Sequence, residues 1–252
     1  MHLDDITPLT RFFGLFAGPS GDGKTCAAVS FPGPIYCFDL DDRIKGALAA
    51  KKWLGKIDLE FHRYFGYADI EVKLNEFVTQ INARTFKYKT VIFDSITASS
   101  RSYIQEAVKL GVKGDTSDDG KPRRLGTVYM PGWNAYNYES IAHYNVIIAY
   151  LKAFPCNVII SAHKSERFNK KGEISGVDIL ARPKIAAELP VYFDEVYEFQ
   201  RDHNDVKNST KYTVKFRGDL AKTVMEKAPF GEVDITEKNF YELLKSYNTS
   251  LT

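Results

Sequence analysis

The sequence predicts an α/β fold in which a mainly parallel β-sheet is flanked by helices and ends in an antiparallel hairpin. Short apolar runs alternate with helical patterns along the chain. Several of these runs are apolar on both faces, which is typical of parallel strands covered by helices. The segment 18–25, GPSGDGKT, joins the first apolar run to a run of small residues. This is the strand–loop–helix order of a phosphate-binding loop.

The individual elements follow from apolar periodicity and from the residues that interrupt it. Apolar or alternating runs predict strands at 12–17, 35–39, 57–65, 90–93, 157–161, 194–201 and 211–217. The last two are joined around 203–205 and predict the hairpin. Helical spacing predicts helices at 24–30, 43–54, 70–83, from after 95 to about 110, and at 134–154, 185–189 and 236–247. The segments 111–133 and 164–176 are polar and basic without a clean period, so we expect two long loops there.

The composition is that of an ordinary globular protein. Hydrophobic residues make up 44% and charged residues 26% of the 252 residues, which disfavours disordered and fibrous classes. We expect one domain over 1–252, with a core at about 12–217 and a C-terminal extension at about 218–252. The formal net charge of +2 is too small to indicate a nucleic-acid-binding surface by itself.

The cysteines and the N-terminal segment indicate in which cellular compartment the protein is expected. Cys26, Cys37 and Cys156 show no C-x-x-C spacing, which disfavours a zinc site and a disulfide scaffold. Residues 1–18 contain no basic region, and their apolar run is too short for a signal or membrane segment. We therefore expect a cytoplasmic protein that does not contact a membrane.

The segment 18–25 fits the pattern G-x-x-x-x-G-K-[ST] in full. Its glycines let successive backbone N–H groups turn toward a phosphate chain, and the N-terminus of the following helix attracts anions. Lys24 can reach the β- and γ-phosphates, and the hydroxyl of Thr25 can bind Mg²⁺. The motif therefore predicts ATP and Mg²⁺ as ligands. The expected nucleotide-binding residues are Gly18, Pro19, Ser20, Gly21, Asp22, Gly23, Lys24, Thr25 and Cys26.

Hydrolysis needs a further acidic residue near the metal, and Asp94 is the candidate. It ends the apolar run in TVIFDS and so falls at the carboxyl edge of the sheet, where open α/β sheets bind ligands. The alternative is that Asp94 caps the next helix. The following residue is Ser95, where many P-loop ATPases carry the glutamate that activates water. The base must therefore come from elsewhere, or the protein hydrolyses ATP poorly.

Two more polar residues follow predicted strands and are candidates for catalysis. Asp41 is, with Asp42, the nearest acid in a position to act as the base; the alternative is a solvated strand end. His163 follows the strand 157–161, where it could sense the γ-phosphate and relay its loss to the next loop. The alternative is a histidine that is merely hydrogen-bonded.

The stretches GPSGDGKT, YCFDLDD, VIFDS and VIISAH together resemble the RecA-type ATPase core. They resemble more closely the small phage-encoded RecA-like proteins that anneal single-stranded DNA (Sak-type), which would place the protein in the host cytoplasm. The resemblance covers about residues 12–217 and implies a RecA-like P-loop fold without the flanking domains of RecA. It implies that the catalytic carboxylate is Asp41, a shorter acid than the family's glutamate, and that His163 is the sensor, where RecA has Gln.

The resemblance also implies that the two polar loops line a path for single-stranded DNA. Cations that neutralise phosphates, interleaved with aromatic rings that stack on bases, suit binding without sequence preference; the alternative is two solvated loops. The expected DNA-binding residues are Lys121, Arg123, Arg124, Lys164, Arg167, Phe168, Lys170 and Lys171. KFRGD, with Lys215 and Arg217, resembles the basic pair that small RecA-like phage proteins carry near the last strand. Arg217 could stabilise the γ-phosphate of a neighbouring subunit; pairing with an acidic surface is the alternative.

We therefore expect a Mg²⁺-dependent ATPase that assembles into a ring or filament of identical subunits and binds single-stranded DNA. It would assist recombination or strand annealing, with a single-strand-binding protein as a candidate partner. Three other functions stay open. A DNA motor of helicase or packaging type would displace strands, a small-molecule phosphotransferase would close its basic loops over a second substrate, and a nucleotide-gated interaction module would bind ATP without hydrolysing it.

Overall fold

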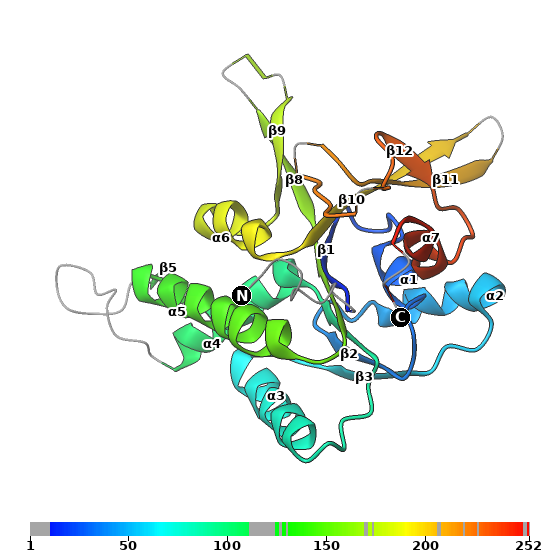
Figure 1. Ribbon diagram of the computed structural model, residues 1–252. Coiled ribbons are helices and arrows are strands. Elements are labelled where there is room, and N and C mark those ends of the chain that lie inside the picture. Colours follow the sequence, from blue (N-terminus) through cyan, green and yellow to red (C-terminus); the bar gives the residue numbers. More distant parts are fainter. Residues whose placement is uncertain are drawn as a thin grey trace, which may run out of the picture.

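The computed structural model confirms the predicted α/β architecture. It describes residues 11–110, 124–125, 128–129, 131–168, 171–172, 174–205, 208–218, 220–225, 227–248 and 251. Among these residues, eight strands form one sheet in the order β12–β11–β10–β1–β7–β4–β2–β3 (Figure 1). They are β1 (Phe13–Ala17), β2 (Ile35–Asp39), β3 (Leu59–Arg63), β4 (Thr90–Asp94), β7 (Asn157–Ala162), β10 (Glu195–Asn204), β11 (Ser209–Lys215) and β12 (Glu232–Asp234). All neighbouring pairs are parallel except two. β10–β11 is the predicted antiparallel hairpin, and β11–β12 is a further antiparallel pair that the sequence did not predict.

Helices cover both faces of this sheet (Figure 1). One face carries α1 (Lys24–Ala28), a 3-10 helix (Ile44–Ala50), α2 (Lys51–Leu54) and α7 (Phe240–Tyr247). The other face carries α3 (Tyr67–Asn82), α4 (Ile96–Lys109), α5 (Trp133–Tyr144) and α6 (Pro183–Glu188). Every residue of β1, β2, β4 and β7 is buried between the two layers. Burial from both sides explains why these four strands are mostly apolar along their length.

An aromatic core attaches the C-terminal helix to the sheet. Phe240, at the start of α7, packs against Phe16 of β1 with the ring centroids 5.6 Å apart. The backbone N–H of Tyr241 donates a hydrogen bond of 3.0 Å to the buried hydroxyl of Ser30, just after α1. These contacts fix the start of α7 against β1 and against the segment just after α1.

Most predicted elements are present, but several bounds differ from the expectation. The helix expected at 134–154 is an α-helix over Trp133–Tyr144 and continues as a π-helix (Asn145–Tyr150) and a 3-10 turn (Leu151–Ala153). The helix expected from 236 begins only at Phe240, because the Asn239 side chain caps it. The described part of 111–133 contains two short paired strands, β5 (Arg124–Leu125) and β6 (Val128–Tyr129).

The expectation of a loop at 164–176 is wrong. β8 (Lys164–Phe168) and β9 (Ile174–Ile179) pair antiparallel and form a hairpin that projects from the body of the molecule (Figure 1). Strands are recognised in a sequence by residues that alternate between core and solvent. A ribbon that projects from the sheet needs no such alternation, and KSERF in β8 shows none. Among the described helices, none combines the length and apolar character that a membrane span requires.

Candidate nucleotide-binding site

The phosphate-binding loop lies at the carboxyl edge of the sheet, between β1 and α1. Its first residue, Gly18, donates a backbone hydrogen bond to the carbonyl of Ala162 at the end of β7. A Cβ at Gly18 would come within 2.6 Å of the backbone oxygen of Phe199, so the loop approaches β10 too closely for any side chain. Gly23 has φ +88°, a left-handed conformation that glycine adopts without strain. The glycines at these two positions therefore set the path of the loop.

Lys24 lies folded under the loop and is 6% exposed. Its Nζ donates to the carbonyl oxygens of Gly18 at 2.8 Å and Pro19 at 2.7 Å. Burial lowers the pKa of Lys24, while the charges of Asp94, Asp22 and Asp41 oppose that shift. A cation held in this way can exchange carbonyl oxygens for phosphate oxygens.

Thr25 and Asp94 meet where the resident magnesium is expected. The Thr25 hydroxyl donates to Asp94 Oδ2 at 2.9 Å, and the Ser161 hydroxyl donates to Asp94 Oδ1. Burial raises the pKa of Asp94, which is 4% exposed, whereas these hydrogen bonds favour its charged form. The side chain that caps α4 is that of Ser95, which accepts from Ala98 N–H at 3.2 Å. The capping alternative for Asp94 is therefore wrong.

The donor set fits Mg²⁺ held together with a nucleotide. In the described part of the chain, no group of three or more His, Cys, Asp or Glu side chains could hold a metal ion. Mg²⁺ is commonly bound by one or two protein oxygens together with water and substrate phosphates. Thr25 Oγ1 and the Asp94 carboxylate provide such a pair next to the loop.

Asp41 and His163 also reach this edge of the sheet, as the sequence predicted. The Ser95 hydroxyl donates to Asp41 Oδ2 at 2.8 Å, and His163 Nε2 lies 3.6 Å from the same oxygen. Burial and the charge of Lys24 lower the pKa of His163, whereas the charge of Asp41 raises it. Ser95, the residue that replaces the expected glutamate, thus holds the alternative acid in place.

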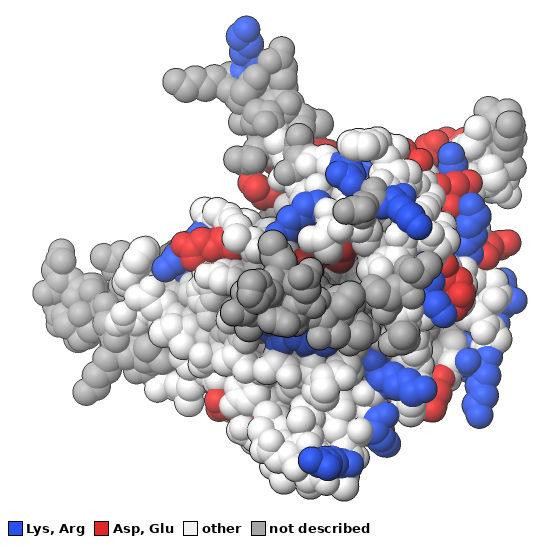
Figure 2. Space-filling model, viewed as in Figure 1, with Lys and Arg blue, Asp and Glu red and all other residues white. Residues whose placement is uncertain are grey.

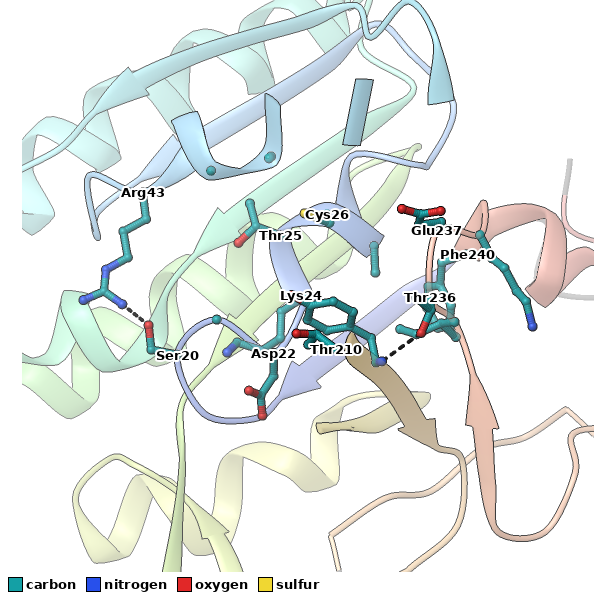
Figure 3. Close-up of a pocket in the computed structure, with 18 of the residues that line it drawn as sticks. Ser20, Asp22, Lys24, Thr25, Cys26, Arg43, Thr210, Thr236, Glu237 and Phe240 are labelled. Carbon is teal, nitrogen blue, oxygen red and sulfur yellow. Dashed lines mark hydrogen bonds between the residues drawn. The ribbon is translucent and has the colours of Figure 1, made fainter. Parts of the chain in front are cut away.

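A cavity of about 750 Å³ opens beside the loop and α1. Figure 3 shows Arg43 on one side of the loop and Thr236, Glu237 and Phe240 on the other. Its described lining includes the aromatic residues Trp53, Tyr212 and Phe240, and the polar residues Thr210 and Thr236. The size and the mixed lining suit the nucleoside part of a nucleotide. Sequence reasoning missed this wall, since no local motif marks 210–212 or 235–240.

Arg217 is not part of this site within its own chain. Its Nη2 lies 3.5 Å from the carbonyl of Met225, and its guanidinium stacks on the ring of Phe230 at 4.6 Å. β11 is antiparallel to β10 and begins near the cavity, so Arg217 follows its opposite end. A role at a γ-phosphate would therefore require a neighbouring subunit.

Those expected DNA-binding residues that the structure describes lie in or next to β5, β8 and β9. Lys121, Arg123 and Lys170 lie outside the described residues. The backbones of Arg124, Arg167 and Phe168 belong to strands, and Lys171 is an exposed turn residue. Lys164 opens β8 directly after His163, and its charge acts on Asp22 of the loop. On the face seen in Figure 2, described basic side chains are interspersed with acidic ones rather than gathered in one large patch.

Fold and site together define a P-loop NTPase: a mainly parallel sheet between helices, with the phosphate-binding loop at its carboxyl edge. The chain matches the AAA domain family over residues 13–223 and belongs to that family of P-loop ATPases. Proteins of this kind generally use ATP and Mg²⁺. No curated protein matches the sequence.

Proposed function

We propose that this protein is a Mg²⁺-dependent, RecA-like ATPase of the phage annealing (Sak) type, which binds single-stranded DNA and assists recombination or strand annealing. One observation carries the proposal. The phosphate-binding loop, the Thr25–Asp94 pair and the Asp41–Ser95–His163 group meet at one edge of the sheet, and the β8–β9 hairpin begins directly after His163.

The chain's own residues divide the work of binding and hydrolysis. Lys24 turns from the carbonyls of Gly18 and Pro19 to the phosphates. Thr25 and Asp94 are the residues that would hold Mg²⁺, which would neutralise charge on the β- and γ-phosphates. Asp41, oriented by Ser95, positions the attacking water.

His163 couples the site to the hairpin in this proposal. The His163 backbone N–H donates to the Thr97 hydroxyl at 3.0 Å, and this hydroxyl donates to the carbonyl of Leu180 at 3.0 Å. His163 precedes β8 and Leu180 follows β9, so Thr97 joins both ends of the hairpin. A displacement of His163 when the γ-phosphate leaves would therefore move both strands, and with them the basic residues proposed to contact DNA.

The proposal includes a homo-oligomer in which Arg217 approaches the γ-phosphate of the neighbouring subunit. Arg217 lies beside Phe230, which is 84% exposed. A half-buried arginine beside an exposed ring suits a contact between subunits. A ring or filament built in this way would place successive hairpins along one DNA strand.

ATP hydrolysis with and without single-stranded DNA, measured over a salt series, tests the proposed function. We expect stimulation by DNA that fades as salt rises, since phosphate contacts release counterions. Hydrolysis that is indifferent to DNA at every salt concentration would contradict the DNA-binding role. Displacement of a duplex strand would favour a DNA motor. Phosphoryl transfer to a small acceptor would favour a phosphotransferase, and saturable ATP binding without phosphate release would favour an interaction module.

A further inference from the structure

Two arginines that the sequence analysis did not single out flank the phosphate-binding loop. Arg43 follows β2, and Arg201 lies in β10. The loop follows β1, which has β10 as its neighbour on one side and is separated from β2 by β7 and β4 on the other. The two cations therefore approach the loop from opposite directions along the sheet.

The backbone of Arg43 is fixed by a hydrogen bond, and its side chain points toward the loop. The buried carboxylate of Asp39 accepts a hydrogen bond of 3.3 Å from the Arg43 backbone N–H. The guanidinium Nη1 donates to the hydroxyl of Ser20 in the loop (Figure 3). Arg43 also acts electrostatically on Lys24 and His163, so it faces the same space as the candidate catalytic residues.

Arg201 covers the loop from the other side. It pairs in register with Tyr212 of β11, three positions beyond Glu198, which is level with the end of β1. Its Nη1 lies 3.2 Å from the point that a Cβ on Gly21 would occupy. The guanidinium thus rests against the loop backbone, near enough for its charge to act on Asp22.

Neither guanidinium group pairs with an acid that the structure describes. Within the described residues, neither forms an ion pair shorter than 4.0 Å. Together with Lys24 they bring three positive charges to one short loop, and the charge of Arg43 contributes to lowering the pKa of Lys24. An anion of high charge bound at the loop would relieve this repulsion, and guanidinium groups match phosphate oxygens in a bidentate geometry.

We propose that Arg43 and Arg201 bind the terminal phosphates of a nucleoside triphosphate within their own chain, so that a single chain supplies cations on both sides of its loop. The inference rests on the proposed function, because it assumes that the loop binds a nucleotide. It extends that function, since each chain then supplies two cations of its own to the terminal phosphates, in addition to Arg217 of a neighbouring subunit.

Dissociation constants for ATP and ADP, measured by calorimetry on the full chain without added DNA, test this inference. Arg43→Ala and Arg201→Ala should each lower the affinity for ATP by about tenfold relative to ADP, since each removes a charge-assisted contact to a phosphate. The loss of ATP affinity should be smaller for Arg201→Lys than for Arg201→Ala, because lysine keeps the positive charge although it lacks the forked guanidinium geometry. Arg101→Ala, an exposed arginine of α4, is the matched control and should leave both constants unchanged.

The outcomes separate this inference from the proposed function. The inference is overturned, and the proposed function stands, if wild-type ATP binding requires Lys24 but the ratio of the dissociation constants for ATP and ADP is unchanged in both arginine variants. A change in only one variant assigns the phosphate role to that arginine and overturns it for the other. Equal losses for ATP and ADP contradict contact with the terminal phosphate, and absence of ATP binding by the wild-type chain overturns both proposals. Thermal melting of each variant confirms that the substitutions act on a folded protein.

Discussion

Two buried polar regions of this protein differ in what surrounds them. At the carboxyl edge of the sheet, Thr25, Asp94 and Asp41 are held by hydroxyl groups next to the glycine-rich loop. Between α4 and α5, the side chains of Glu139 and His143 are 0% and 1% exposed. Neither of these two residues lines the cavity beside the loop.

The difference shows that burial of polar groups does not by itself mark a site. In the α4–α5 region, His143 forms a hydrogen bond with the Ser99 hydroxyl and donates one to the Glu139 carbonyl. Both ring nitrogens of His143 therefore form hydrogen bonds within the packing of the two helices. At the loop, the polar groups converge beside glycines whose backbone can approach a ligand. Substitutions of the polar side chains at the loop should therefore change nucleotide chemistry without unfolding the protein. Substitutions between α4 and α5 should lower the stability without changing nucleotide chemistry.

The largest effect is expected for Lys24→Ala. Loss of this cation should lower kcat/KM for ATP hydrolysis by at least about a thousandfold, because it removes charge stabilisation at the phosphates. The melting temperature should change little, since the bonds lost are two contacts to loop carbonyls. Lys51→Ala on the exposed side of α2 is the control. Undiminished turnover in Lys24→Ala would show that the catalytic site lies elsewhere.

The next largest effect on catalysis is expected for Asp94→Asn. Without the carboxylate, kcat in the presence of Mg²⁺ should fall by at least about a hundredfold. ATP affinity measured in the absence of Mg²⁺ should stay within about twofold of the wild type, because the phosphate contacts of the loop remain. Asp69→Asn, which neutralises an exposed acid of α3, controls for the change in net charge. An equal loss of ATP affinity with and without Mg²⁺ would contradict the assignment of Asp94 to the metal.

The part of the site that the sequence predicted is the part built from short contiguous segments. The loop, the end of β4 and the end of β7 each combine an apolar strand with polar residues directly after it. Parallel strands place their carboxyl ends at one edge, so the sequence alone is enough to expect Asp94 and His163 near Lys24. The strands of the sheet and most helices were likewise predicted from contiguous segments, by their apolar periodicity.

The rest depends on contacts between residues far apart in sequence. Arg201 and Tyr212 reach the loop only through the register of β10 with β1 and β11, which no local pattern reveals. Thr236 lines the cavity because α7 starts after it, at Phe240, which the aromatic core holds in place. The β8–β9 hairpin escaped prediction for a different reason, since a ribbon outside the core leaves no apolar alternation to detect.

The α4–α5 region should respond to pH through His143. Burial lowers the pKa of His143 to about 4 in the folded protein, against about 6.5 when unfolded. Between these values only the unfolded chain binds the proton, so stability is full above about pH 6.5 and decreases as the pH falls toward 4. The free energy of unfolding should drop by about 2 kcal/mol from pH 7 to pH 5 through this group alone.

His143→Gln isolates the contribution of this histidine. Denaturant unfolding of the variant and the wild type at pH 7 and pH 5 should show that the variant lacks this part of the pH dependence, while its KM for ATP at pH 7 is unchanged. His203→Gln, at an exposed position of β10, should keep the wild-type dependence. If the free energy of unfolding depended on pH equally in the wild type and in His143→Gln, His143 would not be shielded from solvent in the folded protein.

The smallest effect is expected in the wall of the cavity, where Tyr212→Ala removes an aromatic ring. A Cβ on Gly23 would lie 3.3 Å from Tyr212 Cδ1, so the ring stands against the loop on the cavity side. If it packs on the nucleoside, ATP affinity should fall by about tenfold in Tyr212→Ala and stay near the wild-type value in Tyr212→Phe, since stacking needs the ring and not the hydroxyl.

Inorganic triphosphate separates the two roles that this ring could have. It carries the phosphates without the nucleoside, so its affinity should be the same in Tyr212→Ala and the wild type. An equal loss for ATP and triphosphate would show that Tyr212 acts by supporting Gly23 and the path of the loop. In that case the aromatic wall would belong with the packing groups between α4 and α5, and the loop alone would account for nucleotide binding.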